Sequence, residues 1–353
     1  MVSTKTREIL FEELSSLIPK LASSRHKGQN GKVGVIGGSF EYTGAPYYGA
    51  CAALRGGGDL SHIFCTEKAA TPIKSYSPEI IVHPYLLSEA DLKREAKKEE
   101  ISDCIESITK WYEPLNAVVM GSGLGRDNAV SACIEKLYSR LEDTVTVCDG
   151  DFFWFLSEKN KEGLAEKIKE RSHVTILTPN KVEFKRMWDF LKGKDKERTS
   201  DDIKNKEKEK LREYKAPILE VSIDNPLVKD QVEIANKLNN VNLLEKGEFD
   251  IITNGKEAYV VKKGGCLKRC GGQGDVLAGL TALYGFWDYN RQKENGGIDG
   301  KKFNLLKGCL ISSYITRYSG AKAYEKYKYG LTTPFLLDEL PGAINDFIEH
   351  GIN

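Results

Sequence analysis

The sequence lacks the features typical of membrane proteins, nucleic-acid-binding proteins and zinc proteins. No apolar run approaches the length of a membrane span. The net charge is +1 with no sustained basic face, so no nucleic-acid partner is expected. The eight cysteines contain no C-x-x-C pair, and the five histidines do not cluster near them. We therefore expect no membrane segment and assign no residue as a metal ligand. The near-neutral charge does not exclude a local pocket that binds a small anionic ligand.

We expect no leader peptide in the first residues of the sequence. Glu8, Glu12 and Glu13 lie where secretory and mitochondrial leaders avoid acidic residues. Several cysteines, such as Cys65 and Cys148, stand inside apolar runs, which is typical of free thiols in a reducing compartment. These features indicate a cytoplasmic protein, although an alternative start site could add a mitochondrial leader. The apolar residues recur at helical spacing and predict an amphipathic helix over residues 1–24.

Short apolar runs alternate with helical patterns along the chain, an arrangement that predicts an α/β fold. Fully apolar strands of this kind indicate a mostly parallel sheet with helices on both faces. Two helices are expected at Ala45–Gly56 and Asn128–Leu141. The expected strands are Lys32–Ile36, Leu60–Cys65, Ile80–Val82, Ala117–Met120, Val145–Cys148, Val174–Leu177, Pro217–Val221, Asp250–Thr253 and Ala258–Val261.

The last two expected strands are separated by Asn254-Gly255, a strong hairpin signal. We expect the sheet to end in this antiparallel hairpin. Two further segments are interpreted as charged surface insertions. Residues 192–215 form either a solvated helix or a mobile loop, and residues 288–302 form a loop.

The strongest functional motif is Gly271-Gly272-Gln273-Gly274-Asp275, which is followed directly by a helical pattern. Glycines allow backbone N–H groups to approach a ligand, and a helix start adds unpaired N–H groups and partial positive charge. Such a site suits a transferring phosphoryl group, with Asp275 placed to take a proton from an attacking hydroxyl. The alternative is that Asp275 only caps the helix and the glycines only form a tight turn.

Two other motifs stand beside predicted strands. Lys246-Gly247 precedes the hairpin and could place a cation near phosphates, or could be a turn with an exposed lysine. Asn180 and Glu183 follow the Val174–Leu177 strand, at the carboxyl end where open α/β sheets bind ligands. Their pattern also fits a capping box, and the two roles are compatible.

Glycine turns follow two more strands, at Gly37-Gly38 and at Gly121–Gly125. Neither fits the G-x-G-x-x-G spacing of a dinucleotide-binding Rossmann site, so that reading is disfavoured. Asp149 and Asp151 follow the Val145–Cys148 strand. They could orient a metal or a ribose, or cap the next helix.

Taken together, the motifs resemble those of the ATP-dependent (S)-NAD(P)H-hydrate dehydratases, in their eukaryotic form. The resemblance runs in order from about His26 to the C-terminal region and leaves out the two charged insertions. Its motifs are His26-Lys27-Gly28, Gly37-Gly38 with Tyr42-Thr43-Gly44-Ala45-Pro46, Ser75–Glu79, Gly123–Asp127, Leu177–Asn180 with Glu183-Phe184, and Gly271–Asp275. Two positions depart from the family pattern: Ser122 stands where many members have Pro, and Phe152 stands where many have Gly.

The resemblance implies one ribokinase-like domain over residues 1–353, a three-layer sandwich that repairs hydrated NADH and NADPH with ATP (or ADP) and Mg²⁺. It implies that phosphorylation of the ring hydroxyl is followed by elimination of phosphate. Asp275 is then the base, and Gly272 and Gly274 belong to the catalytic loop. The implied ATP-binding residues are Lys246, Gly247, Glu248, Phe249, Asp250, Gly265, Cys266, Leu267, Lys268, Arg269, Cys270, Gly271, Gly272, Gln273 and Gly274. The residues implied for the NAD(P)H hydrate are Gly123, Asn180, Lys181, Val182, Glu183, Phe184, Lys185, Arg186 and Asp275.

Two other functions use the same glycine loop. A ribokinase-like kinase would phosphorylate a small alcohol and release the ester. A non-catalytic nucleotide-binding protein would bind ATP without turnover. The sequence leaves the oligomeric state, the phosphate donor and the preferred hydrate open.

Overall fold

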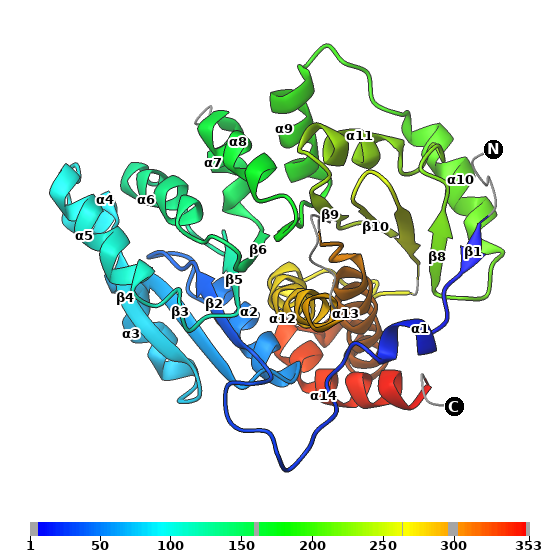
Figure 1. Ribbon diagram of the computed structural model, residues 1–353, viewed down its shortest axis with the longest axis horizontal. Helices are drawn as coiled ribbons and strands as arrows, with labels where there is room; N and C mark the ends of the chain where they lie inside the picture. Colours follow the sequence, from blue (N-terminus) through cyan, green and yellow to red (C-terminus); the bar gives the residue numbers. More distant parts are fainter. Residues whose placement is uncertain (1–5, 159–161, 263, 296–302, 351–353) are drawn as a thin grey trace.

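The strands of the protein form one twisted sheet, seen in a computed structural model that describes the chain except residues 1–5, 159–161, 263, 296–302 and 351–353 (Figure 1). The eleven strands lie in the order β1-β8-β11-β10-β9-β7-β6-β5-β2-β3-β4. Their bounds are β1 Arg7–Glu8, β2 Lys32–Ile36, β3 Leu60–Thr66, β4 Ile81–Leu86, β5 Ala117–Met120, β6 Val145–Cys148, β7 Thr175–Leu177, β8 Ile218–Val221, β9 Asn242–Glu245, β10 Asp250–Thr253 and β11 Ala258–Val261.

The sheet has a parallel part and an antiparallel part. Strands β4, β3, β2, β5, β6, β7 and β9 pair in parallel, whereas β9, β10, β11, β8 and β1 pair antiparallel. The predicted hairpin is confirmed: Gly255 has φ +84° between β10 and β11. The expectation that the sheet ends there is wrong, because β8 and β1 extend it beyond β11. Strand β9 was not anticipated from the sequence.

Helices cover both faces of the sheet, as Figure 1 shows. Alternate residues of the central strands point into different cores. Val119 belongs to the cluster that includes residues of α2, α12, α13 and α14, and Val118 belongs to the cluster that includes residues of α5, α6, α8 and α9. Both faces are therefore apolar, as expected for a parallel sheet. The helices are α1 Glu12–Ser15, α2 Gly44–Arg55, α3 Glu67–Tyr76, α4 Glu89–Leu92, α5 Lys98–Thr109, α6 Asn128–Ser139, α7 Asp151–Glu158, α8 Glu162–Glu170, α9 Lys181–Lys192, α10 Asp201–Arg212, α11 Lys229–Lys237, α12 Gln273–Glu294, α13 Leu306–Tyr327, the short 3₁₀ helix η1 Lys328–Gly330, and α14 Thr333–His350.

The N-terminal segment differs from its prediction. Among the described residues before Lys32, helix is confined to α1, so a helix over 1–24 is wrong. Arg7 and Glu8 instead pair with Glu220 and Leu219 of β8, so that β1 forms the edge of the sheet. Unpaired backbone N–H and C=O groups at a sheet edge favour pairing with another strand. The apolar positions of the N-terminal segment span too few helical turns to favour a helix instead. Ile9, Leu14 and Leu17 still bury their side chains, as the apolar spacing suggested.

The two segments predicted to be charged surface insertions, 192–215 and 288–302, also differ from their predictions in part. Residues 201–212 form α10, so the helical alternative holds for half of 192–215. Residues 288–294 are the last turns of α12 rather than a loop, and Asp288 is buried. Its carboxylate accepts a hydrogen bond from Gly308 N at 3.0 Å, at the start of α13. The tail of that expected loop, 296–302, lies outside the described residues.

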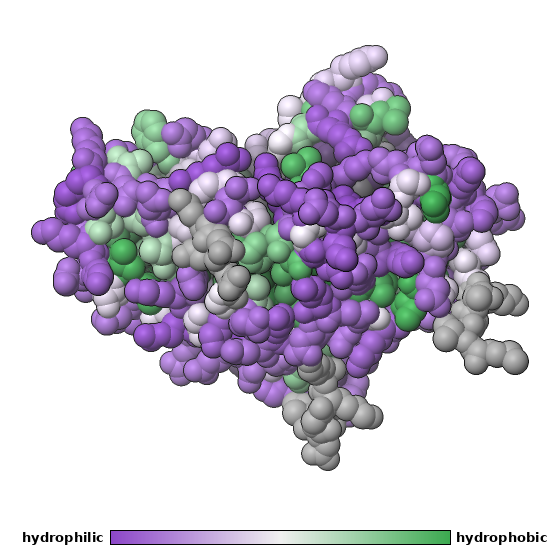
Figure 2. Space-filling view, turned by 90° about the horizontal axis from the view of Figure 1, so that it is seen from above, coloured by the Kyte–Doolittle hydropathy of each residue, from purple (hydrophilic) through white to green (hydrophobic). Residues whose placement is uncertain are grey.

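The described surface is mostly polar. Figure 2 shows hydrophilic side chains over most of one face, with apolar side chains in small, separate patches. Among the described residues, the helices include none whose length and hydrophobicity suffice for a membrane span.

Candidate active site

The carboxyl ends of the parallel strands meet along one edge, where backbone turns cross closely. Gly38 N donates to Ser122 O at 3.0 Å, and Lys246 N donates to Pro179 O at 2.8 Å. The backbone hydrogen bonds between neighbouring segments therefore continue past the strand ends. A Cβ on Gly121 would lie 1.7 Å from the carbonyl oxygen of Asp149, so the turn after β5 requires glycine. This edge brings together the turns after β2, β5, β6, β7 and β9.

Helix α12 begins at this edge with its N-terminus at the glycine loop. Gly272 is the N-cap residue and has φ +98°, a left-handed conformation that favours glycine. A Cβ there would also lie 2.5 Å from the ring of Tyr48. Asp275 is the third residue of α12 and not its cap, so the interpretation of Asp275 as a simple N-cap is wrong. The first N–H groups of the helix lack intrahelical acceptors and favour an anion here.

Lys246 joins the glycine loop to the buried carboxylates. Its ammonium group lies 2.5 Å from Asp149 Oδ1 and 3.9 Å from Glu183 Oε2. A Cβ on Gly274 would lie 3.4 Å from the same nitrogen. Asp149 also accepts from Thr178 Oγ1 at 2.9 Å. The sequence motif around Lys246 therefore supplies a partly buried cation, 17% exposed and paired with carboxylates, rather than an exposed turn lysine.

The carboxyl groups of the site have unusual acidities. Burial and the charge of Asp149 raise the pKa of Asp275 to about 7, against the opposing effect of Lys246. Burial raises the pKa of Glu183 to about 7, again opposed by Lys246. Burial alone would lower the pKa of Lys246, but Asp149 and Glu183 raise it above its usual value, so the ammonium stays charged. Perturbed carboxyl groups beside one cation are typical of catalytic sites.

The turn after β9 is organised by a buried aspartate. Asp250 accepts hydrogen bonds from Gly247 N at 2.9 Å, Ser313 Oγ at 2.7 Å and Arg317 at 3.0 Å. Gly247 and Glu248 are exposed, whereas Phe249 and Asp250 are buried. The structure thus offers the first two for ligand contact and uses the other two to hold the turn.

The loop before α12 is open on one side. Gly264, Gly265 and Gly271 have no atom within 4 Å of an added Cβ. Gln273 Nε2 donates to Cys266 Sγ at 3.0 Å and to Cys270 Sγ at 3.3 Å, which folds the loop back on the helix. Leu267 is 85% exposed, so its side chain makes few contacts within the protein.

The segment after β7 combines capping with site residues. Asn180 Oδ1 accepts from Val182 N and Glu183 N, and Glu183 accepts from Asn180 N at 2.8 Å, so the capping box is confirmed. Phe184 is buried in the core, and Lys185 pairs with Asp189 of its own helix. Of the residues assigned to the hydrate in this segment, Asn180 and Glu183 lie nearest Lys246.

Gly123 lies across the edge, beside the turn that precedes α2. A Cβ on Gly123 would lie 2.8 Å from the Cβ of Tyr42 and 3.1 Å from that of Ala45. Sequence reasoning missed Tyr48 as a site residue, although it packs over Gly272. Its only signal was its place two residues after the Tyr42–Pro46 motif.

Solved structures share this architecture. A ribokinase-like superfamily protein of Enterococcus faecalis V583 superposes with a TM-score of 0.68 at 18% identity, covering 97% of this chain and 96% of its own. The ADP/ATP-dependent NAD(P)H-hydrate dehydratase of Bacillus subtilis, co-crystallised with ATP and Mg²⁺, gives 0.59 at 17% identity, covering 96% and 97%. These likenesses show the ribokinase-like fold.

Sequence comparisons identify the family. The model of the NAD(P)H-hydrate dehydratases matches residues 33–342. The ATP-dependent (S)-NAD(P)H-hydrate dehydratase of Mus musculus is 34% identical, covering 97% of this chain and 87% of the relative. That of Caenorhabditis elegans is 35% identical, covering 95% and 94%. The chain therefore belongs to the NAD(P)H-hydrate dehydratase family.

Proposed function

We propose that the protein dehydrates (S)-NADH hydrate and (S)-NADPH hydrate to NADH and NADPH at the expense of ATP. The observation that supports this most is the convergence of Asp275, the helix start and the Lys246 cation at one sheet edge. The relatives named above are ATP-dependent dehydratases of this substrate. The whole chain would act as a single catalytic domain.

The first step is a phosphoryl transfer. Asp275 takes the proton of the ring hydroxyl, whose oxygen forms a bond to the γ-phosphorus while the bond to ADP breaks. A base with a pKa of about 7 is suited to this role near neutral pH. The N–H groups at the start of α12 and the Lys246 ammonium would stabilise the charge on the transferring group.

The second step is an elimination. The ring carbon–oxygen bond breaks, and its electron pair leaves with phosphate, a far better leaving group than hydroxide. The neighbouring ring carbon loses a proton, which restores the dihydropyridine ring. The products are ADP, phosphate and NADH or NADPH.

Mg²⁺ fits this site as a partner of the nucleotide. Among the described residues, no cluster of three or more acidic, histidine or cysteine side chains could hold a metal by itself. Mg²⁺ usually keeps several waters and binds through one or two carboxylates plus substrate phosphates. Asp149 and Glu183 offer such carboxylates, and the ion would neutralise charge on the phosphates.

The two substrates are assigned to different segments around the helix start. Lys246–Asp250 and Gly265–Gly274 would hold ATP, with Phe249 and Asp250 acting by shaping the turn. Gly123, Asn180–Arg186 and Asp275 would hold the hydrate, with Phe184 acting through the core. All eight cysteines are free thiols, which suits a reducing compartment such as the cytoplasm.

The function is tested by mixing the protein with hydrated NADH, Mg²⁺ and ATP, with ADP in a parallel sample. We expect the near-ultraviolet absorbance of the dihydronicotinamide ring to rise only when nucleotide is present. A sample that binds ATP without this rise would contradict the proposal and would favour a small-molecule kinase, to be sought by screening alcohols for phosphorylation.

A further inference from the structure

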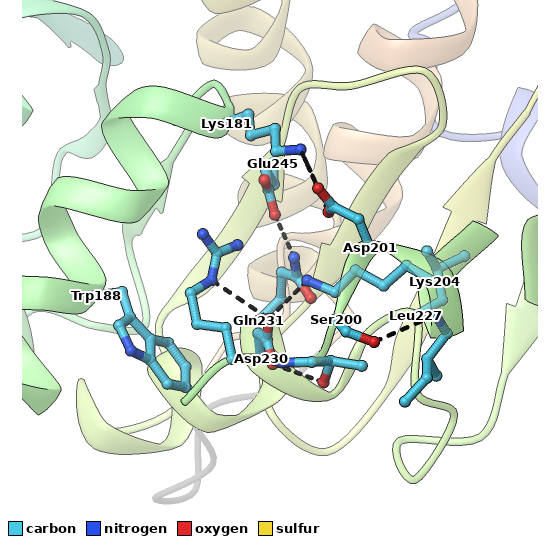
Figure 3. A network of polar contacts seen from close by, with 12 residues as sticks. Lys181, Trp188, Ser200, Asp201, Lys204, Leu227, Asp230, Gln231 and Glu245 are labelled. Atoms are coloured by element: carbon cyan, nitrogen blue, oxygen red, sulfur yellow. Dashed lines mark hydrogen bonds and ion pairs between the residues drawn. The ribbon is translucent and has the colours of Figure 1, made fainter. Parts of the chain in front are cut away.

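A buried aspartate holds the charged segment that the sequence marks as a surface insertion (Figure 3). Asp230 is the second residue of α11, and its side chain is 4% exposed. It accepts hydrogen bonds from Thr199 N at 3.0 Å, Thr199 Oγ1 at 2.9 Å and Lys204 Nζ at 2.6 Å. Arg198 Nε lies 3.4 Å from the same carboxylate. The segment is therefore bound to the body of the protein at its N-terminal end.

The Asp230 carboxyl is ionised in the folded protein. Burial alone would raise its pKa, but the hydrogen bonds from Lys204 and Thr199 lower the pKa below its usual value. A buried charge of this kind becomes costly when one partner is removed, because the remaining charges are left uncompensated. Lys204 is itself only 11% exposed. Removal of the Asp230 charge would thus release the start of α10.

The next residue connects this network to the candidate active site. Gln231 Nε2 donates a hydrogen bond to the buried carboxylate of Glu245, as Figure 3 shows. Glu245 ends β9 and directly precedes Lys246, which lies between Asp149 and Glu183. The start of α11 therefore contacts the strand end from which the Lys246 side chain projects.

The C-terminal end of α10 contacts the turn that follows β9. Lys208 pairs with Glu248 at 3.0 Å, and Arg212 also pairs with Glu248. Leu211 is buried in the same apolar cluster as Phe249. Lys262, which directly follows β11, donates from Nζ to Leu211 O at 2.9 Å. The C-terminal end of residues 198–212 is thus fixed against the turn after β9. Its N-terminal end is fixed to the start of α11, which in turn contacts the strand that leads into the turn.

We propose that residues 198–212 form a brace that positions the Lys246–Asp250 turn for ATP, with Asp230 as its positioning residue. The inference rests on the proposed function, because it assumes that this turn holds the nucleotide. Asp230 itself is a partner of the brace and is not assigned to either substrate. The Asn180–Arg186 segment contacts the brace through the exposed pair Lys181–Asp201 at 3.0 Å and through Arg198, which lies 5.0 Å from the ring centroid of Phe184. Phe184 is held in the core and the Lys181–Asp201 pair is exposed, so binding of the hydrate should depend on the brace less than binding of ATP does.

The main test is Asp230→Asn in the full chain, with Asp224→Asn as the matched control. Asp224 is exposed and precedes α11, so the same chemical change there should have no effect. For Asp230→Asn we expect KM for ATP to rise about tenfold, with kcat and KM for the hydrate within about twofold of the parent. A role in folding alone would not separate KM for ATP from the other constants.

Binding of ADP, measured by calorimetry, gives a readout that does not need turnover. Its Kd should rise with KM for ATP, so the brace remains testable even if the protein proves to be a kinase and not a dehydratase. The double variant Lys208→Gln/Arg212→Gln removes the second anchor and involves more exposed side chains, so it should fold if Asp230→Asn does not. We expect its ADP Kd to rise by about threefold. Parent-like ADP affinity in the folded variants, or loss of kcat with unchanged ADP affinity, would overturn the proposal.

Discussion

At the scale of single residues, the chemistry of the site depends on how three carboxyl groups share one ammonium group. Lys246 contacts Asp149 directly, so that carboxylate is compensated. The carboxyl groups of Asp275 and Glu183 are not in such direct contact with the Lys246 ammonium, and the pKa of each is raised to about 7. Similar residue types thus acquire different tasks from their environments, a pattern typical of acid–base sites.

Replacing Asp275 by Asn should separate binding from chemistry. Asn keeps the size of the side chain and removes the base, so we expect turnover to fall by roughly 10²–10⁴-fold while ATP still binds. Steady-state kinetics and calorimetry with ADP measure the two effects. Asp288→Asn is the matched control, since Asp288 is a buried aspartate of the same helix that contacts the start of α13. Near-normal turnover of Asp275→Asn would exclude the base role.

The pH dependence should reveal the raised pKa of Asp275. A base acts when ionised, so we expect kcat/KM to rise with pH and to level off above about pH 7. Glu183 titrates in the same range, and the Glu183→Gln variant distinguishes the two groups. A flat profile between about pH 5 and 7 would contradict the assignment.

Stability should change in the opposite direction over the same pH range. The folded pKa of Asp275, about 7, lies above its unfolded value, so its contribution is complete below the unfolded pKa and is lost as pH rises through 7. We therefore expect the thermal midpoint of Asp275→Asn to exceed that of the parent at about pH 8 but not at about pH 4. Equal midpoints at both pH values would show that the carboxyl group is not buried as described.

At the scale of elements, the position of Asp275 depends on how closely α12 approaches α2. A Cβ on Gly279 would lie 2.0 Å from Gly49 O, and a Cβ on Gly49 would lie 3.4 Å from Asp275 O. Glycine in a helix interior is ordinarily unfavourable. Here it permits a backbone contact that places the N-terminus of α12 at the sheet edge.

Gly279→Ala should therefore destabilise the fold. The added methyl group meets backbone atoms that cannot rotate away, so we expect a loss of about 1–3 kcal/mol in the free energy of unfolding, together with reduced turnover. Gly342→Ala is the control, because the nearest atom to its added Cβ is the flexible end of Lys322 at 3.6 Å. Urea unfolding of both variants measures the difference. Equal stability would mean that α2 and α12 can separate without cost.

At the scale of the whole molecule, nucleotide binding should stabilise the folded chain. A ligand that binds only the native state, at 100 times its Kd, adds about 2.7 kcal/mol to the free energy of unfolding. We expect ATP with Mg²⁺ to raise the thermal midpoint of the parent and of Asp275→Asn equally. A rise confined to the parent would show that Asp275 contributes to binding, and no rise in either would contradict the proposed ATP site.

Local patterns were enough to identify much of the fold and the main functional motifs. The apolar runs predicted the parallel strands other than β9, Asn254-Gly255 predicted the hairpin, and the Asn180–Glu183 capping box formed as expected. These features depend on contacts between residues close in the chain, which propensity and spacing report directly. The sequence predictions failed where contacts between residues far apart in the chain decide the structure. Arg7 and Glu8 joined a strand more than 200 residues away. Helix α12 continued through a polar segment because Asp288 contacts α13.

The sequence by itself therefore determined the family, the α/β alternation and the glycine loop with its aspartate. Tertiary structure alone decided which charges meet. Asp149, Glu183 and Lys246 come from the ends of different elements, and Asp230 binds a segment 26 residues earlier in the chain. Their pKa values and their roles depend on burial and on distances of a few ångströms, and neither quantity is encoded by spacing along the chain.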